Sequence, residues 1–207
     1  EAYNIPQVLR LEGEVNESAF KTAYQNLLTR HEVLRTVFTE DVEGNPRQRI
    51  LVASEKIFNI HLEDYSNLAT AERECNTAAY VQESISRGFD LEQGPLIRCS
   101  LLKESESSYV WVFVMHHIVS DGWSMGVLYR EFSELYNAAV ESRTPELVPL
   151  SIQYKDYAAW HNAQLQSEAI NPHKGYWLEQ FKEELPVLGL PSDKLRPKVM
   201  TYNGASV

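Results

Sequence analysis

Two adjacent histidines, an aspartate and a glycine are the residues of this chain best suited to chemistry. His116 and His117 end an apolar run over residues 110–115, and Asp121 and Gly122 follow shortly after. Imidazole titrates nearer neutral pH than any other side chain, so a histidine at a cleft is suited to general base catalysis. The run is rich in Val and aromatic residues, which predicts a strand buried on both faces. The histidines therefore come where a strand ends.

Strand geometry separates the roles of the two histidines. Successive side chains point to opposite faces, so His116 shares a face with Val114 and His117 shares the other face with Met115. Diverging imidazoles do not converge on one ion, and no Cys or Glu stands nearby at ligand spacing, so we expect no metal site. Two interpretations stay open. Either both histidines hold a loop as hydrogen-bonded core residues, or one is a general base at the mouth of a cleft.

Asp121 and Gly122 each admit two interpretations as well. Asp121 is suited to capping the helix predicted to begin nearby, or to forming a buried ion pair with an arginine that fixes the loop. In neither role is it a base. Gly122 permits a sharp turn or the close approach of a ligand, and a backbone N–H at this turn could face a developing oxyanion.

Helices and strands in mixed order are predicted to position these residues. Asn16 is the predicted cap of a helix that leads to Arg30, and another helix is expected over residues 124–140, with a core face of Leu128, Phe132, Leu135, Tyr136 and Ala139. A helix over residues 151–166 bears Tyr154, Tyr157 and Trp160, which we expect to be core residues. Strands are expected near residues 8–12, 34–39, 47–52, 58–62, 96–103 and 109–116, and a polar helix over 68–87. This mixed order favours α/β layering around one sheet.

The motif residues bring a known family into view. Residues 116–124, His-His-Ile-Val-Ser-Asp-Gly-Trp-Ser, resemble the His-His-x-x-x-Asp-Gly motif of the condensation domains of nonribosomal peptide synthetases. Residues 30–38, Arg-His-Glu-Val-Leu-Arg-Thr-Val-Phe, resemble the second signature of that family. Further segments resemble the family in the same order, at residues 3–6, 88–96, 154–158 and 190–193. The likeness covers nearly the whole chain.

This resemblance leaves rival functions open. The single His-x-x-x-Asp-Gly is shared by chloramphenicol acetyltransferase-like enzymes generally, so an epimerisation domain or another acyltransferase with this motif is one alternative. A lobe without catalysis, kept for carrier docking, is the other. The residues after Asp-Gly, Trp123-Ser124, look like the condensation type, and the motif is most similar to subtypes that join an L-configured donor to an L-configured acceptor.

The resemblance implies a fold, a division into lobes and a role for each motif residue. It implies a chloramphenicol acetyltransferase-like lobe, an α/β layered sandwich with a mixed sheet flanked by helices. Residues 1–170 would form this N-terminal lobe, and residues 171–207 a crossing segment with the truncated start of a second lobe, so the fragment alone is expected to be inactive. His117 and Gly122 would be catalytic. His116 and Asp121 would support the site, with Asp121 paired to Arg35 in preference to Arg30.

Partners and compartment follow from the same resemblance and from composition. Substrates would arrive on the phosphopantetheine arms of donor and acceptor peptidyl carrier domains, beside an adenylation domain, with no cofactor bound directly. The net charge of −10 over 207 residues argues against nucleic acid and against an anionic membrane surface. Cys75 and Cys99 lack paired spacing, which fits reduced thiols in a cytoplasmic protein, and we expect neither to be catalytic.

Overall fold

The computed structural model describes residues 2–54, 58–187, 189, 191, 194, 198 and 199. The chain divides into two compact units, one from Tyr3 to Lys155 and the other from Asp156 onward, and each is described by itself. The lobe boundary predicted after residue 170 falls within the second unit, between η2 (Glu168–Ile170) and α5 (Asn171–Gln180). No helix among these residues is both long and apolar enough to cross a lipid bilayer.

A four-stranded mixed sheet forms the centre of the first unit. Across the sheet, the strands are β1 (Asn4–Glu12), β6 (Ser108–His116), β5 (Ile97–Ser105) and β4 (Ile60–Asp64). β1 and β5 run antiparallel to β6, whereas β4 runs parallel to β5. β6 has a neighbour on each side and is buried from Tyr109 to Met115, as its apolar run predicts. β1 begins several residues before the predicted strand.

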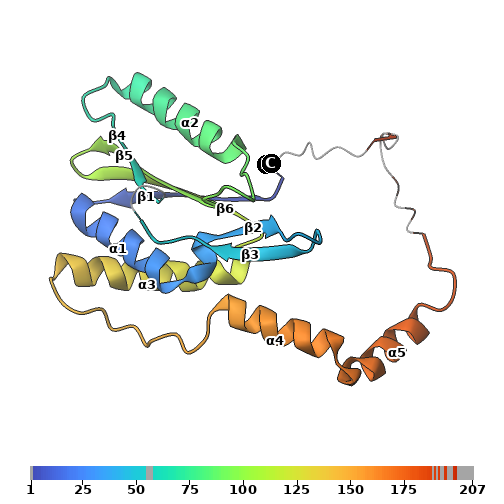
Figure 1. Ribbon diagram of the computed structural model, residues 1–207. Helices are drawn as coiled ribbons and strands as arrows, with labels where there is room; N and C mark the ends of the chain where they lie inside the picture. Colours follow the sequence, from blue (N-terminus) through green and yellow to red (C-terminus); the bar gives the residue numbers. More distant parts are fainter. Residues whose placement is uncertain are drawn as a thin grey trace. The chain divides into compact units, whose positions relative to one another are not determined.

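Helices cover both faces of this sheet (Figure 1). α2 (Thr70–Ser86) covers one face, where Val110, Val112 and Val114 pack with Leu102. α1 (Glu17–Arg30) and α3 (Gly122–Val140) cover the other face, where Trp111, Phe113 and Met115 join the larger core. The predicted alternation of side chains along β6 is therefore confirmed, and so is the α/β layering.

The two helices on the larger core begin at capping residues. Asn16 accepts a hydrogen bond from the backbone N–H of Ala19 through its Oδ1, at 3.0 Å, which confirms the predicted cap of α1. Phe20 of α1 packs edge-on against Trp111 of β6 and Phe132 of α3. Most of the predicted core face of α3 is buried or packs on the core, but Ala138 rather than Ala139 is its buried alanine.

A short helix and a hairpin follow α1. η1 (Glu32–Arg35) leads into β2 (Thr36–Glu40), which pairs antiparallel with β3 (Pro46–Ile50), where strands near residues 34–39 and 47–52 were predicted. Gly44 has a φ of 80°, a value that favours glycine, and it lies in the turn between these strands. Backbone N–H groups of that turn donate to Asp41, which holds its pKa down at about 2.

The helix that begins at Tyr154 differs in exposure from what its sequence pattern predicts. α4 (Tyr154–Gln166) was expected to place Tyr154, Tyr157 and Trp160 in the core, but their exposed fractions are 52%, 43% and 57%. The prediction is wrong for the described residues. Helical spacing identifies which side chains share a face, but it does not identify what covers that face.

Candidate active site

His116 is the last residue of β6, and its imidazole shapes the turn that follows. Its Nδ1 accepts a hydrogen bond from the backbone N–H of Ile118, at 3.1 Å, so this nitrogen carries no proton. The backbone N–H of Val119 donates to the His116 carbonyl at 3.1 Å and closes the turn. Burial is the main reason that the pKa of His116 is lowered, and the nearby charge of His117 is a smaller cause. A neutral His116 is therefore built into the loop.

His117 follows directly, with its backbone held and its side chain exposed. Its backbone N–H donates to the carbonyl of Tyr3 at 2.8 Å, so β1 and the end of β6 fix its main chain. The ring of Tyr3 lies 5.9 Å from the ring of His116, the residue that precedes His117. The paired histidines thus divide into one partly buried imidazole with a backbone partner and one exposed imidazole. Such an exposed group on a fixed backbone is suited to act on a bound substrate.

Asp121 caps α3, and no arginine among the described residues forms an ion pair with it. Its Oδ1 accepts hydrogen bonds from the hydroxyl of Ser124 at 2.5 Å and from the backbone N–H of Ser124 at 2.8 Å. These two hydrogen bonds, followed by the nearby charge of His117, hold the pKa of Asp121 below its usual value. Of the two interpretations drawn from the sequence, the helix cap is confirmed.

The predicted pairing of Asp121 with Arg35, or with Arg30, is therefore wrong. Arg35 donates from Nε to the carbonyl of Leu28 at 2.8 Å and from Nη1 to the carbonyl of Leu51 at 2.6 Å. It joins the end of α1 to the strand region after β3. Carbonyl oxygens accept the hydrogen bonds of Arg35, and the N-terminus of α3 donates hydrogen bonds to Asp121. Because each side chain has partners of its own, the fold does not require an ion pair between them.

Arg30 binds a carboxylate that the sequence analysis did not predict. Glu131 of α3 is only 5% exposed, and Arg30 donates to both of its oxygens, at 2.9 and 3.2 Å. His31 Nε2 lies 2.6 Å from the same carboxylate. Burial alone would raise the pKa of Glu131, but the hydrogen bonds from Arg30 and His31 outweigh it and hold the pKa below the usual value.

The signal for Glu131 was present in the sequence pattern. It stands three residues after Leu128 and directly before Phe132, both on the predicted core face of α3. A carboxylate on a core face needs partners, and the second signature offers an arginine and a histidine at the end of α1. The signature therefore ties the end of α1 to the middle of α3.

Gly122 is exposed and is the first residue of α3. A Cβ added at this position would meet no heavy atom within 4 Å, and its φ lies outside the left-handed region. The sharp-turn interpretation therefore has no support from the local backbone. The other interpretation, the close approach of a ligand, stays a prediction.

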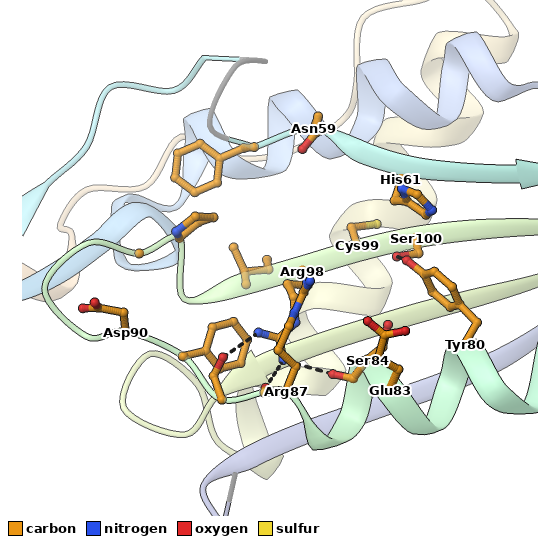
Figure 2. Close-up of a pocket in the computed structure, with 16 residues that line it drawn as sticks. Asn59, His61, Tyr80, Glu83, Ser84, Arg87, Asp90, Arg98, Cys99 and Ser100 are labelled. Atoms are coloured by element: carbon orange, nitrogen blue, oxygen red, sulfur yellow. Dashed lines mark hydrogen bonds between the residues drawn. The ribbon is translucent and has the colours of Figure 1, made fainter.

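A hollow of about 490 Å³ lies between α2 and strands β4 and β5 (Figure 2). Arg98 of β5 crosses it and donates to the carbonyls of Ser84, Arg87 and Gly88, at the end of α2, at 3.0, 2.5 and 3.2 Å. Burial is the main reason that the pKa of Arg98 falls to about 10. Since its donors serve a helix end, Arg98 is a structural cation.

Arg98 also acts on the surroundings of His116. Its Cζ lies 3.7 Å from the centroid of the Phe89 ring, and that ring lies 6.1 Å from the ring of His116, edge-on. Asn4, which pairs with His116 in the β1–β6 register, donates to the carbonyls of Ile85 and Arg87 at 2.7 and 3.0 Å. The end of α2 and the segment after it therefore support the face of His116 that points away from α1.

The two cysteines are free thiols. Cys99 is buried, which raises its pKa to about 12, and Trp111 Nε1 donates to its sulfur at 3.3 Å. Cys75 is exposed, and neither forms a disulfide. Within the part of the chain that the structure describes, no group of three His, Cys, Asp or Glu residues is arranged to hold a metal ion.

Comparisons with known proteins agree with this picture. A family model described as Condensation domain matches residues 1–207. The chain is 38% identical over 202 residues to gramicidin S synthase 2 of Aneurinibacillus migulanus, covering 98% of this chain and 4% of that protein. It is 39% identical over 203 residues to tyrocidine synthase 3 of Brevibacillus parabrevis, covering 98% and 3%. The chain thus spans a small part of these relatives.

A solved structure supports the fold independently. The starter condensation domain of the rhizomide synthetase RzmA matches with a TM-score of 0.77 and 24% sequence identity, over 86% of this chain and 42% of that chain. At this identity the likeness shows the fold, which agrees with the expected mixed sheet flanked by helices. Since the family model matches the chain from end to end, the chain belongs to the condensation domain family.

Proposed function

We propose that this chain takes part in forming a peptide bond between two substrates held as thioesters on the phosphopantetheine arms of carrier domains. The observation that carries the proposal is the pair of histidines at the end of β6, in which His116 is tied into the loop and His117 is exposed. The family membership supports the reaction class. The form of the motif, with Trp123 and Ser124, supports an L-configured donor and an L-configured acceptor.

In the proposed reaction, the amine of the acceptor attacks the thioester carbonyl of the donor. A C–N bond forms, the C–S bond breaks, and the amine proton passes by way of His117 to the departing thiolate. His117 orients the amine and accepts its proton during the attack. Holding two bound reactants together contributes as well, because it removes most of the entropy cost of their encounter.

The beginning of α3 is proposed to stabilise the tetrahedral intermediate. The backbone N–H of Gly122 lies in the first turn of the helix, where the dipole favours negative charge. A Cβ at Gly122 would meet open space, so the protein itself leaves room there for a ligand. Asp121 and His116 hold the two ends of the loop between the motif residues.

We further propose the surroundings in which the chain works. Residues 1–170 are the N-terminal lobe and residues 171–207 the crossing segment and the start of a second lobe, within a cytoplasmic synthetase. Its partners are donor and acceptor carrier domains and a neighbouring adenylation domain. The chain matches 42% of the solved starter condensation domain chain, which supports the view that it supplies only part of the catalytic cleft.

Substitution of His117 in the full synthetase tests the reaction. With two loaded carriers, we expect His117→Ala to lower the rate of dipeptide formation by about 100-fold, the lower range for loss of a general base. His61→Ala, which removes an exposed histidine of β4, is the matched control and keeps the rate. Unchanged turnover in His117→Ala would contradict the assignment. Inversion of a carrier-bound residue without dipeptide would favour an epimerisation domain instead.

A further inference from the structure

A small apolar pocket lies between η1 and the beginning of α3, and the proposed reaction does not use it. Its volume is about 170 Å³, and the side chains that form its walls are mostly apolar: Val33, Leu34, Val119, Trp123, Val127 and Leu128. A cavity of about 150 Å³ with apolar walls holds a benzene ring in other proteins. The pocket therefore has room for a branched aliphatic or an aromatic group, and it is smaller than the usual site for a whole drug-sized ligand.

The polar groups of this pocket have partners within the protein. The Ser124 hydroxyl donates to Asp121, and the Ser120 hydroxyl faces the sulfur of Met125 at 3.9 Å. His31 is held through Nε2 by Glu131. These partners compete with any hydrogen bond to a ligand, so shape and apolar contact decide what the pocket binds.

The pocket lies next to His117 along the chain. Val119, one of its walls, is two residues beyond His117, so their Cα atoms are at most about 7 Å apart. Two of its walls, Leu34 and Leu128, belong to the same core cluster as Met115. A group bound near the His117 imidazole can therefore extend an attached side chain into the pocket.

Trp123 is an exposed wall of the pocket. Its side chain is 87% exposed, although it is the largest apolar residue of the motif. Tryptophan is enriched at binding sites because its large ring gains much from being covered by a partner. Here the exposed ring stands beside a pocket of one ring's size.

We propose that this pocket is a specificity subsite for an apolar side chain of the acceptor amino acid. The inference rests on the proposed function, in which His117 faces the acceptor amine. The amine nitrogen and the Cβ of an amino acid are bonded to the same Cα, so placing the amine at His117 brings the side chain to the neighbouring pocket. Leucine-like or phenylalanine-like acceptors fill it, whereas alanine leaves it largely empty.

Filling the pocket tests the inference in the full synthetase. Val127 contributes a wall, and Val127→Trp places a large ring inside. We expect this variant to lower the ratio of rates for leucyl over alanyl acceptor, each on the acceptor carrier with the same donor, by about tenfold. Val140→Trp is the matched control, since Val140 is an exposed valine at the far end of the same helix. A ratio that Val127→Trp leaves unchanged would overturn the subsite.

A binding measurement on the 207-residue chain separates this inference from the proposed reaction. Leucyl N-acetylcysteamine thioester is titrated while the methyl NMR signals of Val33, Val127 and Val140 are followed. We expect shifts at Val33 and Val127 but not at Val140, and much weaker shifts with the alanyl thioester. Shifts without any turnover by the wild-type synthetase would leave the subsite standing and contradict the reaction. Turnover without these shifts would overturn the subsite and leave the reaction standing.

Discussion

At the scale of single residues, neighbours with the same side chain have different tasks because their partners differ. His116 accepts a backbone hydrogen bond through Nδ1 and is partly buried, whereas His117 has an exposed imidazole on a fixed backbone. Because both residues are histidines, residue type alone does not indicate this difference. Strand alternation predicted that they would differ, and the hydrogen bond to Ile118 shows which one belongs to the scaffold.

Burial of the His116 imidazole, which lowers its pKa, predicts that stability depends on pH. The unfolded imidazole titrates near about 6.5 and the folded one lower, so the unfolded state binds the proton first as pH falls. The free energy of unfolding is therefore unaffected well above that pH, declines below it, and levels off beneath the folded pKa. His116→Asn keeps an acceptor for the Ile118 N–H without a titrating ring.

Urea unfolding at about pH 7.5, 6 and 5, values that bracket the ordinary histidine pKa, measures this effect. We expect the wild-type chain to lose stability relative to His116→Asn as pH falls, so that the gap between them closes. His116→Leu, which removes the acceptor, is less stable than both at the highest pH. A gap between wild type and His116→Asn that is constant with pH would refute the account of His116.

Asp121 offers a second test at this scale. As an N-cap, it contributes about 1 kcal/mol to the stability of α3, and Asp121→Ala loses that amount while Asp121→Ser keeps most of it. Because Arg35 binds other carbonyls, Asp121→Ala and Arg35→Ala are expected to add within about 0.5 kcal/mol. A double-mutant cycle from urea unfolding checks both. Coupling well above that limit would restore the ion pair between Asp121 and Arg35.

At the scale of elements, the site depends on how α1, η1 and α3 are joined. Arg30 ends α1, His31 precedes η1, and both bind Glu131 in the middle of α3. This contact fixes His31, which lines the small pocket between η1 and the beginning of α3. The positions of α1 and α3 follow from caps and from apolar periodicity, which is why sequence reasoning found both helices.

What sequence reasoning missed lies in the contacts between elements. It paired Asp121 with Arg35 because the family resemblance implied an ion pair with an arginine of the second signature, yet the two motifs carry no distances. It placed Trp160 in a core because helical spacing defines a face, although nothing in that spacing names the partner of the face. Glu131 was overlooked for a related reason. A single acid within an apolar stripe needs a cationic partner, and the spacing of the stripe does not identify that partner.

The contact at Glu131 predicts a large loss of stability. Glu131→Ala leaves Arg30 and His31 without their shared acceptor, and breaking such a buried pair costs about 3 kcal/mol. Glu134→Ala is the matched control on the same helix, because its pair with Arg143 is more exposed and is expected to matter clearly less. The shift of the urea midpoint measures both. Equal shifts would mean that burial does not determine how much these ion pairs contribute to the free energy of unfolding.

At the scale of the whole molecule, two compact units stand in contrast. The first has a core around β6, whereas α4 and α5 have no buried residue, and their aromatic side chains contact one another in pairs such as Tyr157 with Trp160 and Trp177 with Phe181. The site residues all belong to the first unit.

The isolated 207-residue chain is therefore expected to fold and to bind the acceptor mimic but not to form peptide bonds at the rate of the synthetase. Most of the rate of a reaction between two bound substrates comes from holding both, and the chain matches only 42% of a solved starter condensation domain chain. Circular dichroism and urea unfolding establish that the chain folds, and dipeptide formation from two loaded carriers measures its activity. We expect the isolated chain to remain at background while the synthetase turns over, and His117→Ala to reduce only the synthetase. Full activity of the isolated chain would show that one lobe holds both substrates, and the division of the cleft proposed above would then be wrong.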